Sequence, residues 1–231
     1  MNARNYQKEL EAIIDRHQKA GEVPRLLIHA CCAPCSSYVM EYLSRYFQID
    51  FYFYNPNIDT AIEYEQRKAE LVRLAGAIPA EHPIGVVSED WDPEAFYRIA
   101  KGHEQDPERG ERCLRCYELR LRKTAAYMKA QNQALSADGG PDLQRQSGTS
   151  RYDYFATTLS ISPLKSAQAL NEIGERIALE YGLSWLPSDF KKKGGYLRST
   201  ELSRAYGLYR QDYCGCVYSK QEAKRRNEKS C

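Results

Sequence analysis

Three cysteines in five positions, Cys31, Cys32 and Cys35, directly follow an apolar run over residues 26–28. The run has the length and composition of a short buried strand, and residues 36–46 behind the cysteines have the pattern of a helix, with a serine available as its N-cap. A strand that ends in a tight turn and opens a helix is where open α/β sheets build their sites. Backbone N–H groups at a helix start favour the thiolate, so these cysteines are candidate metal ligands.

Short strands and helices alternate along the rest of the chain. The expected strands are residues 26–28, 49–54, 82–87, 154–159 and 183–186. The expected helices are residues 5–19, 36–46, 60–74, 113–133, 164–181 and 199–206, with a further helix beginning near 90–93. Such alternation is typical of a parallel sheet with right-handed crossovers. We therefore predict the α/β class, with one domain over residues 1–231.

Composition narrows the class of protein. The chain has 231 residues, 42% of them hydrophobic, which is enough for one ample core. Its net charge of +2 does not indicate a nucleic-acid binder, so local clusters must provide any such function. Residues 1–22 are charged and lack an apolar h-region, and no apolar run approaches the ~18 residues of a membrane helix. We expect a cytoplasmic protein, in which clustered cysteines are metal ligands or redox groups rather than disulfides.

Two segments contain few apolar side chains that could be buried. Residues 136–150 are rich in Gly, Ser, Asp and Gln, and we predict a flexible surface insertion because strand-like sequence resumes directly after them. Residues 221–231 are charged and predict a frayed tail.

The remaining cysteines form two further groups. Cys113 and Cys116 have C-x₂-C spacing at a predicted helix start, and Cys214 and Cys216 flank one glycine. Alone, such pairs fit zinc, a redox dithiol or an iron–sulfur cluster. The three groups together contain seven cysteines, enough to provide four thiolates for a cubane cluster and up to three for something else. We assign no role to Cys231. Structural zinc is the main alternative, although adjacent cysteines fit its usual spacings poorly.

Basic and aromatic residues gather in the last third of the chain. The segment 189–196 contains two glycines and three lysines, Lys191, Lys192 and Lys193, which predict a phosphate-contacting loop or simply a solvated charged turn. Arg198 and Arg210 follow, interleaved with tyrosines. The pattern is typical of surfaces that stack bases and pair phosphates, although each tyrosine also fits ordinary packing.

Three polar residues at strand ends are further candidates. His29 is either a ligand or proton donor, or a hydrogen-bonded core histidine. Asn55 and Asn57 end the second strand, where they serve either a substrate or a structural turn. A Walker loop and a G-x-G-x-x-G motif are both absent, so conventional nucleotide binding is not supported.

Six motifs recur in an order that resembles the epoxyqueuosine reductase family of the QueH type. They are His-Ala-Cys-Cys-Ala-Pro-Cys-Ser-Ser, Phe-Tyr-Asn-Pro-Asn-Ile, Glu-Arg-Cys-x-x-Cys-Tyr, Thr-Thr-Leu-Ser-Ile-Ser-Pro, Asp-Phe-Lys-Lys-Lys-Gly-Gly-Tyr and Leu-Tyr-Arg-Gln-Asp-Tyr-Cys-Gly-Cys. The resemblance implies a Rossmann-like sheet with flanking helices, similar to adenine nucleotide hydrolases. It also implies reduction of epoxyqueuosine to queuosine at the wobble position of tRNA, without cobalamin, by a [4Fe-4S] cluster beside a single iron.

The resemblance further implies roles for individual residues. Cys31, Cys32, Cys113 and Cys116 would hold the cluster, and Cys35, Cys214 and Cys216 the second iron. Some family members have aspartate at the position of Cys35, so this chain would offer a softer ligand there. The candidate proton donors are His29, Asp212 and Tyr213. The implied partners are tRNA that contains epoxyqueuosine and an unidentified electron donor.

Two other functions compete with this interpretation. A zinc-stabilised RNA-binding protein without redox chemistry would differ in metal content and colour. A cluster-dependent tRNA thiolation enzyme of the ATP-pyrophosphatase type would need a phosphate loop after the first strand, where this chain has the cysteine turn instead.

Overall fold

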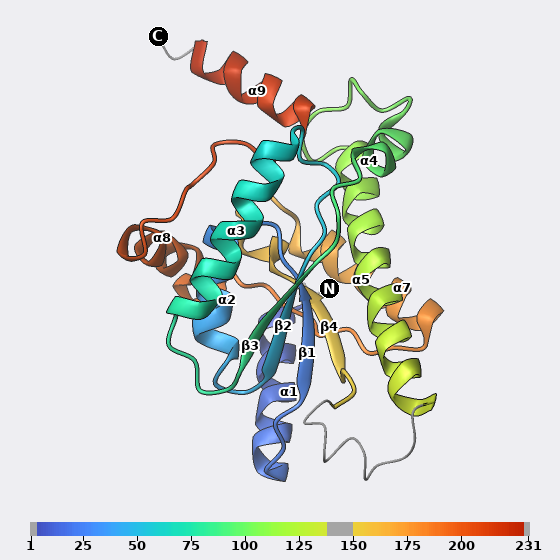
Figure 1. The fold of residues 1–231 in the computed structure, drawn as a ribbon, viewed down its shortest axis with the longest axis vertical. Coiled ribbons are helices and arrows are strands. Elements are labelled where there is room, and N and C mark those ends of the chain that lie inside the picture. Colours follow the sequence, from blue (N-terminus) through green and yellow to red (C-terminus); the bar gives the residue numbers. More distant parts are fainter. Residues whose placement is uncertain (1–3, 138–149, 229–231) are drawn as a thin grey trace.

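Four parallel strands in the order β3-β2-β1-β4 form the sheet of this protein (Figure 1), described by a computed structural model for residues 4–137 and 150–228. The strands are β1 Arg25–His29, β2 Gln48–Phe53, β3 Ile84–Ser88 and β4 Tyr154–Thr157. The helices are α1 Tyr6–Ala20, α2 Ala33–Leu43, α3 Ala61–Ala77, α4 Pro93–Ala100, α5 Glu111–Ala137, α7 Ala167–Tyr181, α8 Gly195–Ala205 and α9 Val217–Glu228. Two short 3₁₀ turns are η1 Thr158–Ile161 and η2 Lys192–Gly194. The predicted α/β class with a parallel sheet is confirmed.

Side-chain alternation along the strands divides the core into two layers. On β1, Leu26 and Ile28 face one cluster of buried residues, which includes side chains of α1, α2 and α3. Leu27 points the other way, into a cluster that α5 and α7 complete. Figure 1 shows the corresponding arrangement, with α2, α3 and α8 on one side of the sheet and α5 and α7 on the other. Because side chains alternate with period two, one strand supplies both layers.

Short polar residues begin several helices, as the sequence predicts, but the serine cap expected for the helix behind the cysteines is wrong. Helix α2 already begins at Ala33, with Cys32 as its N-cap and no side-chain cap hydrogen bond, because Pro34 suits the first turn of a helix. Thr60 accepts a hydrogen bond from the Glu63 N–H at the start of α3. Asp92 caps α4 in the same way, with Pro93 in its first turn. Gly182 ends α7 in the left-handed conformation that a residue without a Cβ adopts freely.

Several boundaries differ from the expectations. The strand expected over 183–186 is wrong: Trp185 makes one isolated bridge to Phe155, because the Gly182 cap and Pro187 leave only Ser184 and Leu186 to bond the Phe155 backbone. The fourth strand ends at Thr157 and continues as η1, and the helix expected from 164 begins at Ala167.

The expected insertion and tail are described only in part. Helix α5 continues to Ala137, past the expected start of the insertion at 136, and residues 138–149 lie outside the described residues. Helix α9 covers the expected tail as far as Glu228, and residues 229–231 again lie outside. None of the helices in the described part of the chain is long and apolar enough to cross a membrane.

Candidate metal centre and substrate cavity

The candidate site lies at the carboxyl ends of β1 and β4. The chain moves from β1 to β2 and β3 on one side and adds β4 on the other, so the strand order reverses between β1 and β4. Cys31 follows β1 and Thr158 follows β4, and their Sγ and Oγ1 atoms are 3.8 Å apart. The cysteine turn therefore lies where this class of fold opens a crevice.

Cys31, Cys32 and Cys35 form a compact group of thiols. Their sulfur atoms all lie within 4.8 Å of one another, with Cys32 at the N-cap of α2 and Cys35 in its first turn. Hydrogen bonds from the other two thiols hold the pKa of Cys31 well below its usual range, and hydrogen bonds to Cys31 and Cys32, together with burial, raise the pKa of Cys35. The group thus loses one proton easily and resists losing the others, unless a cation is bound among the sulfurs.

Four other thiols line a second, smaller cavity. Cys113 and Cys116 lie in the first turns of α5, and Cys214 and Cys216 reach the same cavity from the loop before α9. Burial raises the pKa of Cys113 to about 11 and that of Cys116 to about 12. The sequence predicted these two pairs as partners of the cysteine turn, and the fold places them beside it.

A glycine is required between the last two cysteines. Gly215 has φ of 130°, which side chains rarely allow. A Cβ there would lie 3.1 Å from Nη1 of Arg67 and 3.2 Å from Nδ2 of Asn57. The Cys-Gly-Cys motif therefore reflects a close approach of backbone to buried side chains.

The two cavities meet at Cys214, which lines both. The larger cavity has Cys31, Cys32 and Cys35 in its lining. Among the predicted substrate and proton-donor residues, it brings together Arg210, Asp212 and Tyr213. The seven thiols thus form one continuous site, open to a chamber of mixed polar and aromatic character.

Other predicted residues lie outside the larger cavity. The three lysines bond within the fold or lie on its surface: Lys191 pairs with Asp189 at 2.7 Å, Lys193 pairs with Glu11, and Lys192 begins η2 and is exposed. Arg198 pairs with Glu41 at 2.6 Å and with Glu201 at 3.0 Å. Their predicted contact with RNA is not favoured by these ion pairs.

The two asparagines have different surroundings. The buried Asn55 donates from Nδ2 to the Ala30 carbonyl at 2.9 Å, and so ties the turn after β2 to the end of β1. Asn57 is 3% exposed and lines the cavity of the four thiols, where its Oδ1 has no hydrogen-bond partner in the described part of the chain.

His29 is a core histidine in the fold. Its Nε2 lies 3.1 Å from Nε of Arg120 and 3.2 Å from the Tyr54 carbonyl oxygen, and its Nδ1 lies 3.0 Å from Oγ1 of Thr157. Because Nε of Arg120 always carries a proton, we assign it as the donor to Nε2 and place the ring proton on Nδ1. Burial, together with the charge of Arg120, lowers the pKa of His29 to about 3. Its role as a proton donor stays a prediction that neither its burial nor its pKa favours.

The buried His29 predicts a pH-dependent stability. Above about pH 6.5, folded and unfolded chains both hold the ring neutral; below it, the unfolded ring takes up a proton that the folded ring refuses until about pH 3. Through this residue, the free energy of unfolding should therefore fall by about 1.4 kcal/mol for each unit that the pH drops below about 6.5. Urea denaturation between pH 7 and 4 should show a shallower decline for His29→Gln, and an unchanged slope would contradict the assignment.

Three cations of the site have no conspicuous sequence signal. Arg120 stands among other charged residues in the sequence of its helix, yet it is 1% exposed, and its Nη2 donates to Oδ1 of Asn55 at 2.7 Å. Arg67 is also buried, and its Nη1 donates to the Cys214 carbonyl at 3.2 Å. Lys165 lines the larger cavity. The one available hint was the spacing of Arg120, four residues after Cys116 on the same helix face.

These cations suit a centre rich in thiolates. Burial disfavours the charge of Lys165, but Cys214, Tyr117 and Cys31 raise its pKa above the ordinary value. Nη1 of Arg120 lies 3.9 Å from the Cys116 sulfur. Fixed positive charges beside sulfur favour ionised ligands, because they offset the negative charge that accumulates there.

The donor set fits iron and iron–sulfur chemistry. All seven cysteines of the described part of the chain are free thiols. Soft thiolates select iron–sulfur clusters, zinc or copper(I), rather than magnesium or calcium. Seven thiols exceed the four of a structural zinc site. The residues therefore fit a cluster together with a further metal ion.

Comparisons with known proteins find one family over most of the chain. The model of the protein family described as epoxyqueuosine reductase QueH matches residues 26–137 and 143–222. The epoxyqueuosine reductase QueH of Staphylococcus epidermidis is 37% identical over 93% of this chain and 84% of its own length. That of Streptococcus pyogenes is 36% identical over 93% and 78%, and that of Thermotoga maritima is 31% identical over 84% and 89%.

Proposed function

Because the chain belongs to the epoxyqueuosine reductase QueH family, we propose that it reduces epoxyqueuosine in tRNA to queuosine with a [4Fe-4S] cluster and an adjacent iron. The observation that carries the proposal is the gathering of seven thiols around two cavities that meet at Cys214. Arg67, Lys165 and Arg210 line the larger of the two. Reduced thiols persist in the cytoplasm, where we place this chemistry.

We assign Cys31, Cys32, Cys113 and Cys116 to the cluster. Cys31 and Cys113 pack against the same layer of the core, and the charge of Arg120 acts to lower the pKa of both Cys31 and Cys116. The short sulfur distances among Cys31, Cys32 and Cys35 support a competing division, in which these three hold the single iron and the other four the cluster. Iron and sulfide analysis of Cys32→Ala and Cys216→Ala decides between them: sulfide is lost from the first under our assignment and from the second under the other.

Cys35 belongs to the single iron under either division. Its sulfur lies in the compact group at the cavity floor. An iron ion with a free coordination position acts as a Lewis acid, and a cluster supplies electrons one at a time. Thiolate in place of the aspartate of some relatives makes this site softer.

The reaction requires protons as well as electrons. Removing the epoxide oxygen to leave an alkene consumes two electrons and two protons and releases water. Asp212 and Tyr213 line the substrate cavity next to the thiols and are the proposed donors. The Arg67 guanidinium lies 5.3 Å from the centre of the Tyr213 ring and holds that ring in place. An electron donor must dock to the protein to complete the cycle.

One preparation tests the proposal. Anaerobically purified protein should contain about four sulfides and four to five irons per chain, with broad absorption near 400 nm, as a cubane plus one iron requires. Incubation with epoxyqueuosine-containing tRNA and a reductant should then yield queuosine, detected by mass spectrometry of the digested nucleosides. Stoichiometric zinc without sulfide in a colourless, iron-replete preparation would refute the reductase and favour an RNA-binding protein without redox activity.

Arg210 is expected to bind the tRNA backbone. It lies at the cavity, 5.9 Å from the centre of the Tyr196 ring, and donates to Oγ of Ser203 at 3.1 Å. Arg210→Ala should raise the KM for tRNA about tenfold with little change in kcat, and reduce the salt dependence of binding by about one phosphate contact. Lys19→Ala, at the far end of α1 and paired with Asp15, is the charge-matched control. Equal KM values for the two variants would contradict this role.

A further inference from the structure

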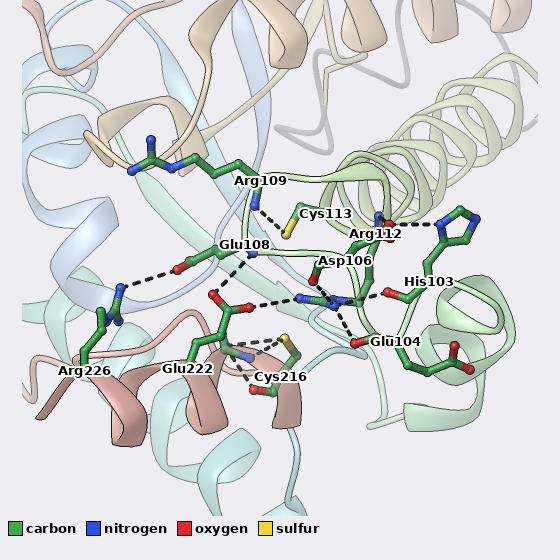
Figure 2. Close-up of polar contacts among 11 residues, drawn as sticks. His103, Glu104, Asp106, Glu108, Arg109, Arg112, Cys113, Cys216, Glu222 and Arg226 are labelled. Atoms are coloured by element: carbon green, nitrogen blue, oxygen red, sulfur yellow. Dashed lines mark hydrogen bonds and ion pairs between the residues drawn. The ribbon is translucent and has the colours of Figure 1, made fainter. Parts of the chain in front are cut away.

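A loop of charged residues leads into the first cysteine of α5. Figure 2 shows this loop, residues 103–110, and the first turn of α5, beside the start of α9. Arg112, in that first turn, is 1% exposed, and its Nη1 donates to the loop carbonyls of His103, Glu104 and Asp106 at 3.1, 3.0 and 2.5 Å. A planar guanidinium that binds several carbonyls fixes the path of the backbone between them.

Further contacts fix the rest of the loop. The Arg112 backbone N–H donates to Oδ2 of Asp106 at 3.1 Å, and the same oxygen lies 2.9 Å from Nδ1 of His103. Glu222 of α9 accepts from the Glu108 N–H at 3.3 Å and lies 3.5 Å from Nη2 of Arg112. The loop is thus held at both ends and tied to α9.

These contacts hold a backbone N–H group against the sulfur of Cys113, which we assign to the cluster. Arg109 has φ of 78°, an uncommon conformation for a residue with a side chain, and its backbone N–H donates to Sγ of Cys113 at 3.3 Å. Figure 2 shows its guanidinium extending away from Cys113, so the amide, and not the side chain, makes the contact. Unfavourable backbone conformations persist only where the surroundings impose them, and they cluster at functional sites.

We infer that Arg112 is a positioning residue for the metal centre, which holds the Arg109 amide on the Cys113 sulfur and thereby raises the reduction potential of the cluster. The inference rests on the proposed [4Fe-4S] cluster. Hydrogen bonds to ligand sulfurs stabilise the reduced state, because that state has the greater negative charge. Arg112 acts through the loop that it organises, and substrate need not touch it.

Arg112→Lys separates this role from the charge alone. Lysine keeps the positive charge but has no second nitrogen to face Glu222, and its flexible stem does not hold a donor rigidly at the position of Nη1, where the three carbonyls converge. We expect the equilibrium between oxidised and reduced cluster to shift about tenfold toward the oxidised form at a given potential, which is a potential lower by about 59 mV for one electron. Arg112→Gln should shift it at least as far. Arg109→Ala is the matched control, because it removes a side chain but keeps the amide, and its potential should equal that of the wild type.

The measurement is an anaerobic redox titration of the loaded protein, followed by electron paramagnetic resonance. Hyperfine spectra before and after exchange into D₂O should show one strongly coupled exchangeable proton fewer in Arg112→Lys. A purely structural role would lower the melting temperature and leave both readouts unchanged, and that result overturns the inference. If neither Arg112→Lys nor Arg112→Gln loads a cluster, Glu222→Ala decides. A smaller shift of the potential in the same direction supports the inference, and an unchanged potential overturns it.

The same titration distinguishes two kinds of failure. A wild-type chain that binds no cluster would refute the proposed function and, with it, this inference. A loaded wild type, with variants that keep its potential and its proton coupling, would refute the inference alone.

Discussion

Cys116→Ala is expected to yield protein with no sulfide, no absorption near 400 nm and no measurable formation of queuosine. Cys116 is 6% exposed, lines the cavity of the four thiols and belongs to the cluster under either division of the ligands. Alanine leaves one iron corner without a protein ligand, in a pocket too closed for an easy substitute. The measurement combines sulfide and iron analysis with the tRNA assay, on protein purified without oxygen.

Two further substitutions make the Cys116 result specific. Cys231→Ala removes a thiol outside the described residues, to which the sequence assigns no role, and should keep both the cluster and the activity. Cys35→Ala should keep four sulfides and lose one iron together with activity. Cys35→Asp restores a ligand found in some family members and should retain that iron. Full sulfide content in Cys116→Ala would contradict the cluster assignment.

Arg120→Met is expected to reduce activity and metal affinity about 10–100-fold, as the loss of a residue that supports metal ligands typically does. The guanidinium binds His29, Asn55 and the Cys116 sulfur at once. Its removal leaves the buried Oδ1 of Asn55 unpaired, at a cost of about 1–3 kcal/mol. It also removes the positive charge that offsets the thiolates, so loaded protein should lose more stability than metal-free protein. Denaturation of both forms, with iron analysis, measures the difference.

Arg122→Met is the matched control on the same helix. Arg122 is a half-exposed residue that pairs with Glu118 at 2.8 Å and with Glu180 at 2.6 Å. Surface pairs contribute about 0–1 kcal/mol, so this variant should stay near the wild-type stability and load its metals fully. If Arg120→Met loaded metal as well as Arg122→Met, the electrostatic role of Arg120 would be refuted.

The short-range features of this protein could be predicted from its sequence. The run before Cys31, the helix behind it and the caps Thr60 and Gly182 depend on hydrogen bonds and side-chain periods within a few residues. Alternation of strands and helices was enough for a parallel sheet, and the carboxyl edge of such a sheet is where crevices open. The distinctive motifs around the cysteines also indicated the family.

The depth at which charged residues lie was decided only by the tertiary structure. Nothing in the local sequence marks Arg67, Arg112 and Arg120 as buried, yet all three are. The fold brings Arg67 to the Cys214 carbonyl, Arg120 to Asn55 and Arg112 to Glu222 of α9. The lysines of the 189–196 segment predicted either a phosphate-contacting loop or a solvated charged turn, and the fold pairs Lys191 and Lys193 with carboxylates. A local pattern cannot report such contacts: the cost of burying a charge is offset only by partners that the folded chain brings together.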